Sequence, residues 1–247
     1  MRAHSQRSFA VIMGTKPPSA ASATAVPPGF RSSLLEGLTP SEIKPVLAAA
    51  RQRRIFSREV IQHEGEPASH LFLLVTGRAA AYQLTAEGSK LFLRWLVPGD
   101  AFGLRTTQRE PSVLLWTVQA VREGSVLVWD RDSALALLLR YPRLGENLYA
   151  TLMDHVASLI NVLVARAGQT AQQRLARMLI ESARQLGCAG RRGIEFDLTN
   201  EELADMADVS LFTASRQLSE WHRQGILEKR RGKILLRAPE RLVSQHF

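Results

Sequence analysis

The stretch DVSLFTASRQLSEW, residues 208–221, decides the fold of the C-terminal part of this chain. Ser210 is a residue type that caps the first turn of a helix, because its hydroxyl accepts a hydrogen bond from a free backbone amide. Ala214, Leu218 and Trp221 then recur at helical spacing and give the segment one inward face. The stretch therefore predicts a short helix that begins after Ser210 and packs through small and apolar residues.

A second short helix precedes this one. Thr199 followed by Glu202 is a capping box, in which the hydroxyl accepts from a first-turn amide and the carboxylate reaches back to the start of the helix. The connection between the two helices is a tight turn at Asp208-Val209. Two short helices joined by so tight a turn predict a helix-turn-helix.

The residues that follow predict a β-hairpin. ILEKRRGKILLR, residues 226–237, places two apolar strands around a turn near Gly232. The tip of the hairpin is basic and carries Lys229, Arg230, Arg231 and Lys233. A helix-turn-helix followed by a basic hairpin is a winged helix, and its cations are suited to DNA phosphates, which add affinity without sequence information.

Composition limits the remaining classes. The chain has 247 residues, enough for two modest domains or one large one. Its net charge of +9 indicates a polyanionic partner such as nucleic acid, with simple solubility as the alternative. Cys188 is the only cysteine, which excludes an internal disulfide and a Cys-ligated cluster built from one chain. No apolar run approaches the ~20 residues of a membrane span, and the N-terminus has too short an apolar centre for a secretion signal. We therefore expect a cytoplasmic protein with no membrane partner.

The pattern changes along the N-terminal half. Residues 1–28 are rich in Ala, Ser, Thr and Pro without a period and are expected to be a disordered tail, and residues 38–50 predict a short capped helix. Residues 53–130 contain short β-rich runs, and turn-forming glycines separate the first of them at intervals of 12, 11 and 11 residues, which predicts a sandwich or a barrel. The runs are IFSREVI, HLFLLV, RAAAYQL, KLFLRWLV, VLLWTVQAV and SVLVWD.

Residues 142–168 predict one long helix with few breakers. Apolar residues advance along it by 3, 4, 3 and 4 positions and draw a narrow seam. A seam of this width beside a barrel typically pairs with a second copy of itself, so we expect a homodimer; the alternative is a helix packed on its own domain. The seam residues are Tyr149, Leu152, Val156, Leu159 and Leu163.

Two parts of the chain resemble the Crp/Fnr family of transcriptional regulators. LTNEELADMADVS (198–210), TASRQLSEWHRQGIL (213–227) and RGKILL (231–236) resemble the DNA-binding domain of that family. HEGEPASHLFLLVTGRAAAYQLTAEGSKLFLRWLVPGDAFG (63–103) is similar to its cyclic-nucleotide-binding-like jelly roll. The segments follow one another in the family's order and with its intervals.

The resemblance implies an α+β fold in three parts. These are a jelly-roll sensor domain at 29–141, a dimerisation helix at 142–168 and a winged helix-turn-helix domain at 169–247. It also implies a homodimer that places two recognition helices in adjacent major grooves of double-stranded DNA, with a palindromic operator as the target and RNA polymerase as a further partner.

The resemblance assigns base contacts to the start of the recognition helix. Arg216 matches the family's arginine, whose guanidinium suits guanine O6 and N7 in a bidentate contact, and Ser215 matches a position that touches base or phosphate. Leu211 and Phe212 stand where well-known members carry Arg, Val or Glu. For Phe212 two alternatives stay open: contact with thymine methyls, or packing in the core. The expected DNA-contacting residues of this helix are Ser210, Leu211, Phe212, Thr213, Ser215 and Arg216.

The sensor domain departs from the cyclic-nucleotide binders of the family. Leu104 stands where those proteins carry a glutamate for the ribose, and Leu114-Leu115 replace the Arg-Ser pair for the phosphate. A buried phosphate without a fixed cation is costly, so cyclic AMP is not expected to bind; Arg105 and Arg109 are expected in a loop, in contact with solvent. The expected sensor-pocket positions are Gly99, Asp100, Phe102, Gly103, Leu104, Leu114 and Leu115.

Haem is another effector found in the family. His63 and His70 fall at strand ends and are expected to be surface residues, while His155 adjoins the dimer seam, where a helix-borne ligand would sit. We predict no cofactor and no metal site, and a barrel that responds to haem or to another small molecule is the alternative. The sequence has no phosphate-binding glycine loop, metal-spaced cluster or nucleophile elbow, so an enzyme with catalytic residues is not expected.

Overall fold

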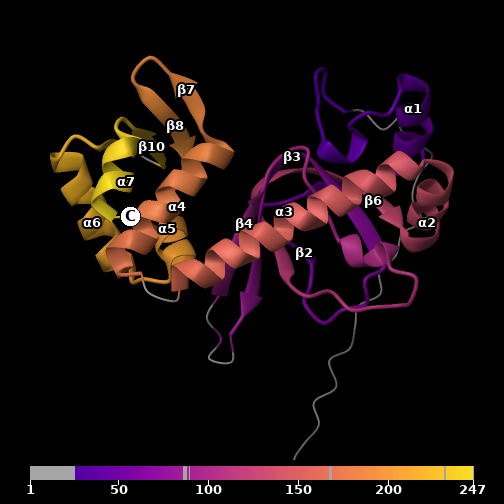
Figure 1. Ribbon diagram of the computed structural model, residues 1–247, viewed down its shortest axis with the longest axis horizontal. Coiled ribbons are helices and arrows are strands. Elements are labelled where there is room, and N and C mark those ends of the chain that lie inside the picture. Colours follow the sequence, from indigo (N-terminus) through magenta and orange to yellow (C-terminus); the bar gives the residue numbers. More distant parts are fainter. Residues whose placement is uncertain (1–25, 86–87, 89, 167–168, 231, 247) are drawn as a thin grey trace, which may run out of the picture.

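The computed structural model describes residues 26–85, 88, 90–166, 169–230 and 232–246. Of the expected tail, residues 1–28, only the last three lie within the described residues. A β-rich body of residues 51–130, called the barrel below, and a winged helix of residues 171–246 are joined by one long helix that runs along the barrel (Figure 1). The predicted α+β class, with a sensor domain, a long helix and a winged helix in that order, is confirmed.

The barrel is an antiparallel sheet in the order β1-β6-β3-β4, with β2 paired to β6 and β5 paired to β3. Alternate side chains of the strands face the interior, where a cluster of buried side chains from Ile55 to Val128 fills the barrel. Parts of β3 and β6 are apolar on both faces, because their other side chains, such as Leu73 and Trp129, belong to a second buried cluster. The strands are β1 (Arg51–Ile55), β2 (Val60–Gln62), β3 (His70–Leu84), β4 (Lys90–Leu96), β5 (Ala101–Phe102) and β6 (Thr117–Asp130).

Two expected strand breaks do not occur. The runs HLFLLV and RAAAYQL form the single 15-residue strand β3, and the last two runs merge into the 14-residue strand β6. The β3–β6 pairing shifts register around Gly77, where φ is 89° and an added Cβ would lie 2.6 Å from the backbone oxygen of Glu123. Gly77 therefore marks a bulge that bends the strand without ending it.

Short helices close the end of the barrel far from the winged helix (Figure 1). Their buried side chains form one cluster with Trp129, whose Nε1 donates to the backbone oxygen of Val46 at 2.9 Å. Arg105 lies in the second 3-10 helix, half-buried, and not in a loop as expected, whereas Arg109 is exposed. These elements are η1 (Ser33–Leu35), α1 (Pro40–Ala48), η2 (Leu104–Thr107) and α2 (Arg131–Arg140).

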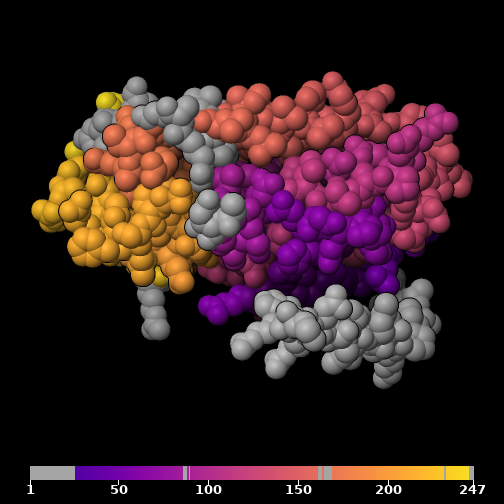
Figure 2. All heavy atoms as spheres, turned by 90° about the horizontal axis from the view of Figure 1, so that it is seen from below, coloured from indigo at the N-terminus to yellow at the C-terminus, as the bar shows by residue number. Residues whose placement is uncertain are grey.

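The long helix α3 (Pro142–Arg166) has two apolar faces. One face packs on the barrel and buries Leu144, Leu148 and His155. The other is open to solvent in the single chain and runs along one side of the molecule (Figure 2). It carries the exposed side chains of Tyr149, Leu152, Met153, Val156, Ile160 and Leu163, which we call the α3 stripe. Four of the five expected seam residues belong to the stripe; Leu159 is half-buried because it turns toward Trp116 of the barrel.

The winged helix has a four-stranded sheet in the order β7-β8-β10-β9, two strands more than the hairpin expected from the sequence. Ala214, Leu218 and Trp221 are each 0% exposed, which confirms the predicted inward face. The elements are α4 (Ala171–Leu186), β7 (Cys188–Gly190), β8 (Gly193–Asp197), α5 (Asn200–Ala207), α6 (Leu211–Arg223), β9 (Leu227–Arg230), β10 (Lys233–Leu236) and α7 (Pro239–His246). Among the described residues, no helix is both long and apolar enough to span a membrane.

Candidate functional site

The helix-turn-helix is built from the local signals that predict it. Thr199 Oγ1 accepts from the Glu202 amide at 3.1 Å, and Glu202 Oε2 accepts from the Thr199 amide at 2.7 Å, so the capping box of α5 is formed. Asp208 ends α5 in the left-handed conformation with φ 52°. Ser210 Oγ accepts from the Thr213 amide at 3.1 Å and starts α6. The two helices are thus held at a turn of three residues, 208–210.

The N-terminal part of α6 presents apolar and cationic side chains to solvent. Leu211 is 54% exposed and Phe212 is 75% exposed, so packing of Phe212 in the core is wrong for this structure. Arg216 is exposed and makes no ion pair with any described residue. Ser215 is half-buried, and its hydroxyl lies 3.4 Å from Asn200 Nδ2, which places it at the contact between α5 and α6.

The basic hairpin is partly neutralised by its own domain. Arg230 pairs with Glu228 at 3.2 Å and with Glu195 at 3.5 Å, and Lys233 pairs with Glu195 at 3.1 Å. Lys229 is half-buried, while Arg231 lies outside the described residues. A phosphate group at the wing has to compete with these carboxylates for Arg230 and Lys233, which the sequence alone did not reveal.

The expected sensor-pocket residues do not gather in one cavity. Asp100 is part of the turn before β5, where Oδ2 accepts from the Val97 amide at 2.9 Å and from Arg94 Nη2 at 3.1 Å. Leu104 packs toward the cluster around Trp129, outside the barrel interior. Leu115 is 47% exposed. The remaining four positions, Gly99, Phe102, Gly103 and Leu114, are buried within the barrel backbone and core.

A different group of side chains occupies the junction between the barrel and α3. Trp116 meets the His155 ring edge-on, with ring centroids 6.1 Å apart, and with Leu93 and Leu159 they leave a cavity of about 10 Å³, room for one water at most. His155 is 4% exposed, so it faces the barrel and not the dimer seam as expected. Its two ring nitrogens have no hydrogen-bond partner among the described residues.

The ionisation of His155 follows from this burial. Removal from water, together with the nearby Arg94, lowers the pKa of His155 to about 4. The imidazole is therefore neutral near pH 7. His63 is exposed and His70 is half-buried with Nδ1 2.8 Å from Ser69 Oγ, in line with their expected surface positions.

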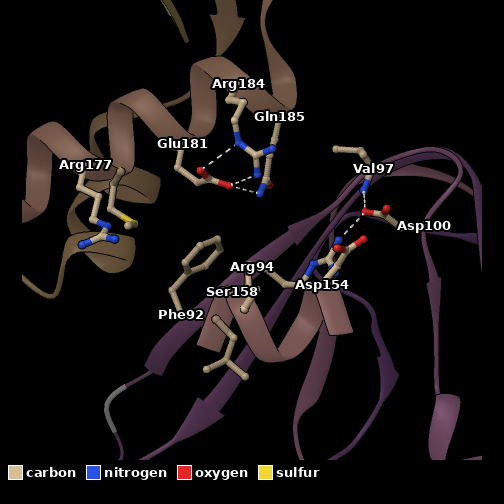
Figure 3. A pocket seen from close by; sticks show the side chains of 13 residues that line it. Phe92, Arg94, Val97, Asp100, Asp154, Ser158, Arg177, Glu181, Arg184 and Gln185 are labelled. Atoms are coloured by element: carbon tan, nitrogen blue, oxygen red, sulfur yellow. Dashed lines mark hydrogen bonds and ion pairs between the residues drawn. The ribbon is translucent and has the colours of Figure 1, made fainter. Parts of the chain in front are cut away.

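A larger cleft lies between β4, α3 and α4 (Figure 3). Its volume is about 600 Å³, and its wall mixes three arginines with three carboxylates. Arg94 is bound to Asp100, and Arg184 is bound to Glu181 at 2.7 Å, so most of these charges are already paired within the chain. No group of three or more His, Cys, Asp and Glu residues in the described part of the chain could hold a metal ion.

A helix-turn-helix with an exposed arginine, a hairpin wing and a β-barrel attached through a long helix define a DNA-binding regulator with a sensor domain. Family models agree: the cyclic nucleotide-binding domain matches residues 52–141, and the Crp-like helix-turn-helix domain matches residues 173–244. The chain belongs to the Crp/Fnr family of transcriptional regulators. Its homologues regulate transcription, and it is a regulator and not an enzyme.

Relatives and solved structures match four fifths or more of this chain. The cyclic AMP receptor protein of Thermus thermophilus is 27% identical over 210 residues, which are 83% of this chain and 93% of that protein. A CRP-like cAMP-activated global transcriptional regulator of Mycobacterium tuberculosis is 22% identical over 215 residues, 86% and 96% of the two chains. The structure of FixK2 from Bradyrhizobium japonicum matches with a TM-score of 0.71 and 28% identity, over 80% of this chain and 98% of that one.

Proposed function

We propose that the chain acts as a homodimer that binds a palindromic operator, with α6 of each copy in the major groove. The exposed N-terminal face of α6 carries this proposal. Arg216 is exposed and without an ion pair among the described residues, which suits a bidentate contact with guanine. Phe212, 75% exposed, suits contact with a thymine methyl in the same groove.

The α3 stripe supports the homodimer. Six apolar side chains on one helix face are exposed in the single chain, and a helix of 25 residues is long enough to pair with its copy over several turns. When the α3 stripe packs against the same stripe of a second copy, the dimer has two-fold symmetry. A palindromic operator requires this symmetry, because its two half-sites are related by the same two-fold axis. We propose the domain bounds 29–141 for the sensor domain, 142–168 for the dimerisation helix and 169–247 for the winged helix-turn-helix domain. RNA polymerase is the proposed protein partner of the DNA-bound dimer. Because the proposed target is chromosomal DNA, the proposed location of the protein is the cytoplasm.

We further propose that the barrel does not bind cyclic AMP. The junction between barrel and α3 is filled by Trp116, His155 and Leu159, with about 10 Å³ left open. Leu104 and Leu114-Leu115 offer neither an acceptor for a ribose nor a cation for a phosphate. Haem is the alternative effector, and the buried imidazole of His155 is the type of side chain that would bind its iron. The residues around His155 do not fit haem, however, because the cavity of about 10 Å³ has no room for a porphyrin. An absorption spectrum of the purified protein decides between a haem band and none.

Genome-wide mapping of bound DNA tests the proposed function. The expected result is a set of sites that share one inverted repeat, with half-site centres about one helical turn apart. Bound sites without an inverted repeat, or no reproducible sites, would contradict it. The same data identify the operator needed for the binding measurements below.

A further inference from the structure

A buried arginine of the barrel reaches into the winged helix. Arg78 follows the bulge at Gly77 on β3, and its side chain is 8% exposed. Its Nη1 donates to the backbone oxygen of Asp197 at 2.6 Å, and its Nη2 donates to Glu202 Oε1 at 3.3 Å. Asp197 is the last residue of β8, and Glu202 lies in the first turn of α5. The barrel is thus bonded directly to the start of the helix-turn-helix.

The Glu202 carboxylate is shared between two tasks. Its Oε2 completes the capping box of α5, and its Oε1 accepts from Arg78 and, at 3.2 Å, from Arg122 on β6. One carboxylate therefore caps α5 with one oxygen and binds two arginines of the barrel with the other. A rotation of α5 relative to the barrel must break these charge-assisted hydrogen bonds, unless β3 and β6 move together with α5.

Trp95 on β4 strengthens the same contact. The Arg78 guanidinium lies over its ring, 4.7 Å from the centroid. Trp95 is 2% exposed and packs within the apolar core of the winged helix, although it belongs to a barrel strand. Its Nε1 lies 3.4 Å from the buried hydroxyl of Ser182 on α4. Arg78 is therefore held from one side by the cap of α5 and from the other by a ring seated in the winged-helix core.

We propose that Arg78 is a positioning residue that fixes the orientation of the helix-turn-helix on the barrel. In the dimer this orientation sets the separation and the relative rotation of the two α6 helices, and hence the half-site spacing that the protein accepts. The role rests on the proposed dimeric, operator-binding function. Without the contact of Arg78, each winged helix still folds and binds a half-site, but its orientation relative to the barrel is no longer fixed.

Four variants separate this role from simple stability. Arg78→Gln removes the charge and the guanidinium fork. Glu202→Gln keeps the capping box, since glutamine also serves at that position, but loses the ion pair. Arg54→Gln is the matched control, because Arg54 pairs with Glu123 at 3.5 Å on the exposed surface of the same barrel, with side chains 70% and 69% exposed. Arg78→Lys keeps a charge without the fork and should restore only part of the wild-type behaviour.

A distance measurement within one chain tests the orientation without DNA. Cys188 on β7 is the only cysteine in the sequence and is exposed, and Leu139 on α2 is 87% exposed, so Leu139→Cys gives a second label site beside the barrel. Spin-labelled protein is diluted into unlabelled Cys188→Ser protein so that only pairs within one chain are observed. Arg78→Gln and Glu202→Gln should each broaden the distance distribution, and Arg54→Gln should not. Unchanged distributions in both folded variants would overturn the proposal.

Operators with altered spacing test the consequence for DNA binding. One base pair added between the half-sites moves them by about 3.4 Å and rotates them by about 34°. The wild type should bind this duplex at least about tenfold more weakly than the operator, a loss of about 1.4 kcal/mol. For Arg78→Gln and Glu202→Gln the ratio should fall below about threefold, with single half-site affinity unchanged. If both variants keep the wild-type ratio between the affinities for the two duplexes, the positioning role of Arg78 is contradicted. If the wild type binds no palindrome, the proposed function is contradicted. The distance measurement then decides on the role of Arg78 by itself.

Discussion

Replacing Arg216 with alanine should remove sequence preference while leaving general DNA affinity almost unchanged. The side chain is exposed and makes no ion pair among the described residues, so the melting temperature should stay at the wild-type value. In a dimer the substitution removes two bidentate contacts of about 1–3 kcal/mol each. The operator should therefore bind more weakly by about 2–6 kcal/mol, a factor between about 30 and 10⁴. Binding to random DNA, which depends on phosphate contacts, should change only by the loss of one positive charge per chain.

Arg223 provides the matched control for this loss of charge. It lies seven positions after Arg216 on α6, which is about two helical turns and therefore the same helix face, about 10 Å further along the axis. Its side chain is exposed and pairs with Glu220. Arg223→Ala should weaken operator and random duplexes by the same small factor, because it removes a charge but no base contact.

Fluorescence anisotropy with the operator and with a scrambled duplex, each at two salt concentrations, measures these losses. The scrambled duplex has the same length and composition, so the ratio of the two dissociation constants isolates sequence preference. The ratio should fall for Arg216→Ala and stay constant for Arg223→Ala. Equal losses on both duplexes for Arg216→Ala would refute the assignment of Arg216 as the base-reading arginine.

Three further variants test other parts of the structure. Phe212→Ala should relax the preference at one A·T position without lowering the melting temperature, since Phe212 is 75% exposed; a destabilised domain in a thermal melt would contradict this. Val156→Glu should give monomers in light scattering, because each copy places a carboxylate in the α3 stripe at a desolvation cost of several kcal/mol; a persistent dimer would place the interface elsewhere. The pKa of His155, lowered to about 4 by burial and Arg94, lies below the unfolded value of about 6.5, so acid protonates the unfolded chain first. Relative to His155→Leu, the wild type should lose about 3 kcal/mol of unfolding free energy as the pH falls from 6.5 to 4. Chemical denaturation at several pH values measures this loss. A difference in unfolding free energy between the two proteins that stays constant over this pH range would contradict the lowered pKa of His155.

The parts of the fold that the sequence predicts are those set by neighbours along the chain. The capping box of α5 joins residues three positions apart, and Ser210 caps its own helix, so both can be seen as motifs. The inward face of α6 has the helical period and was predicted for the same reason. The sequence does not predict the unbroken β3, because Gly77 forms a bulge and a glycine at such a position is equally typical of a turn.

The parts that the sequence does not predict depend on contacts between distant segments. Arg78 and Glu202 are 124 positions apart, and no local pattern connects them. Trp116 and His155 meet only because α3 packs on the barrel. One signal for His155 was present: Leu144, Leu148, Thr151 and His155 are spaced by 4, 3 and 4 positions and form a second buried face of the helix. This spacing shows that His155 faces away from the α3 stripe.

The affinity of the protein for its mapped operator, measured with and without millimolar cyclic AMP at fixed salt, tests the central claim most directly. The dimer should bind with a dissociation constant of about 10⁻⁸ M or tighter in the absence of any nucleotide. Cyclic AMP should leave that constant unchanged, because Leu104 and Leu114-Leu115 offer neither an acceptor for the ribose nor a cation for the phosphate. Binding that appears only when cyclic AMP is added, and that saturates with it, would contradict the account.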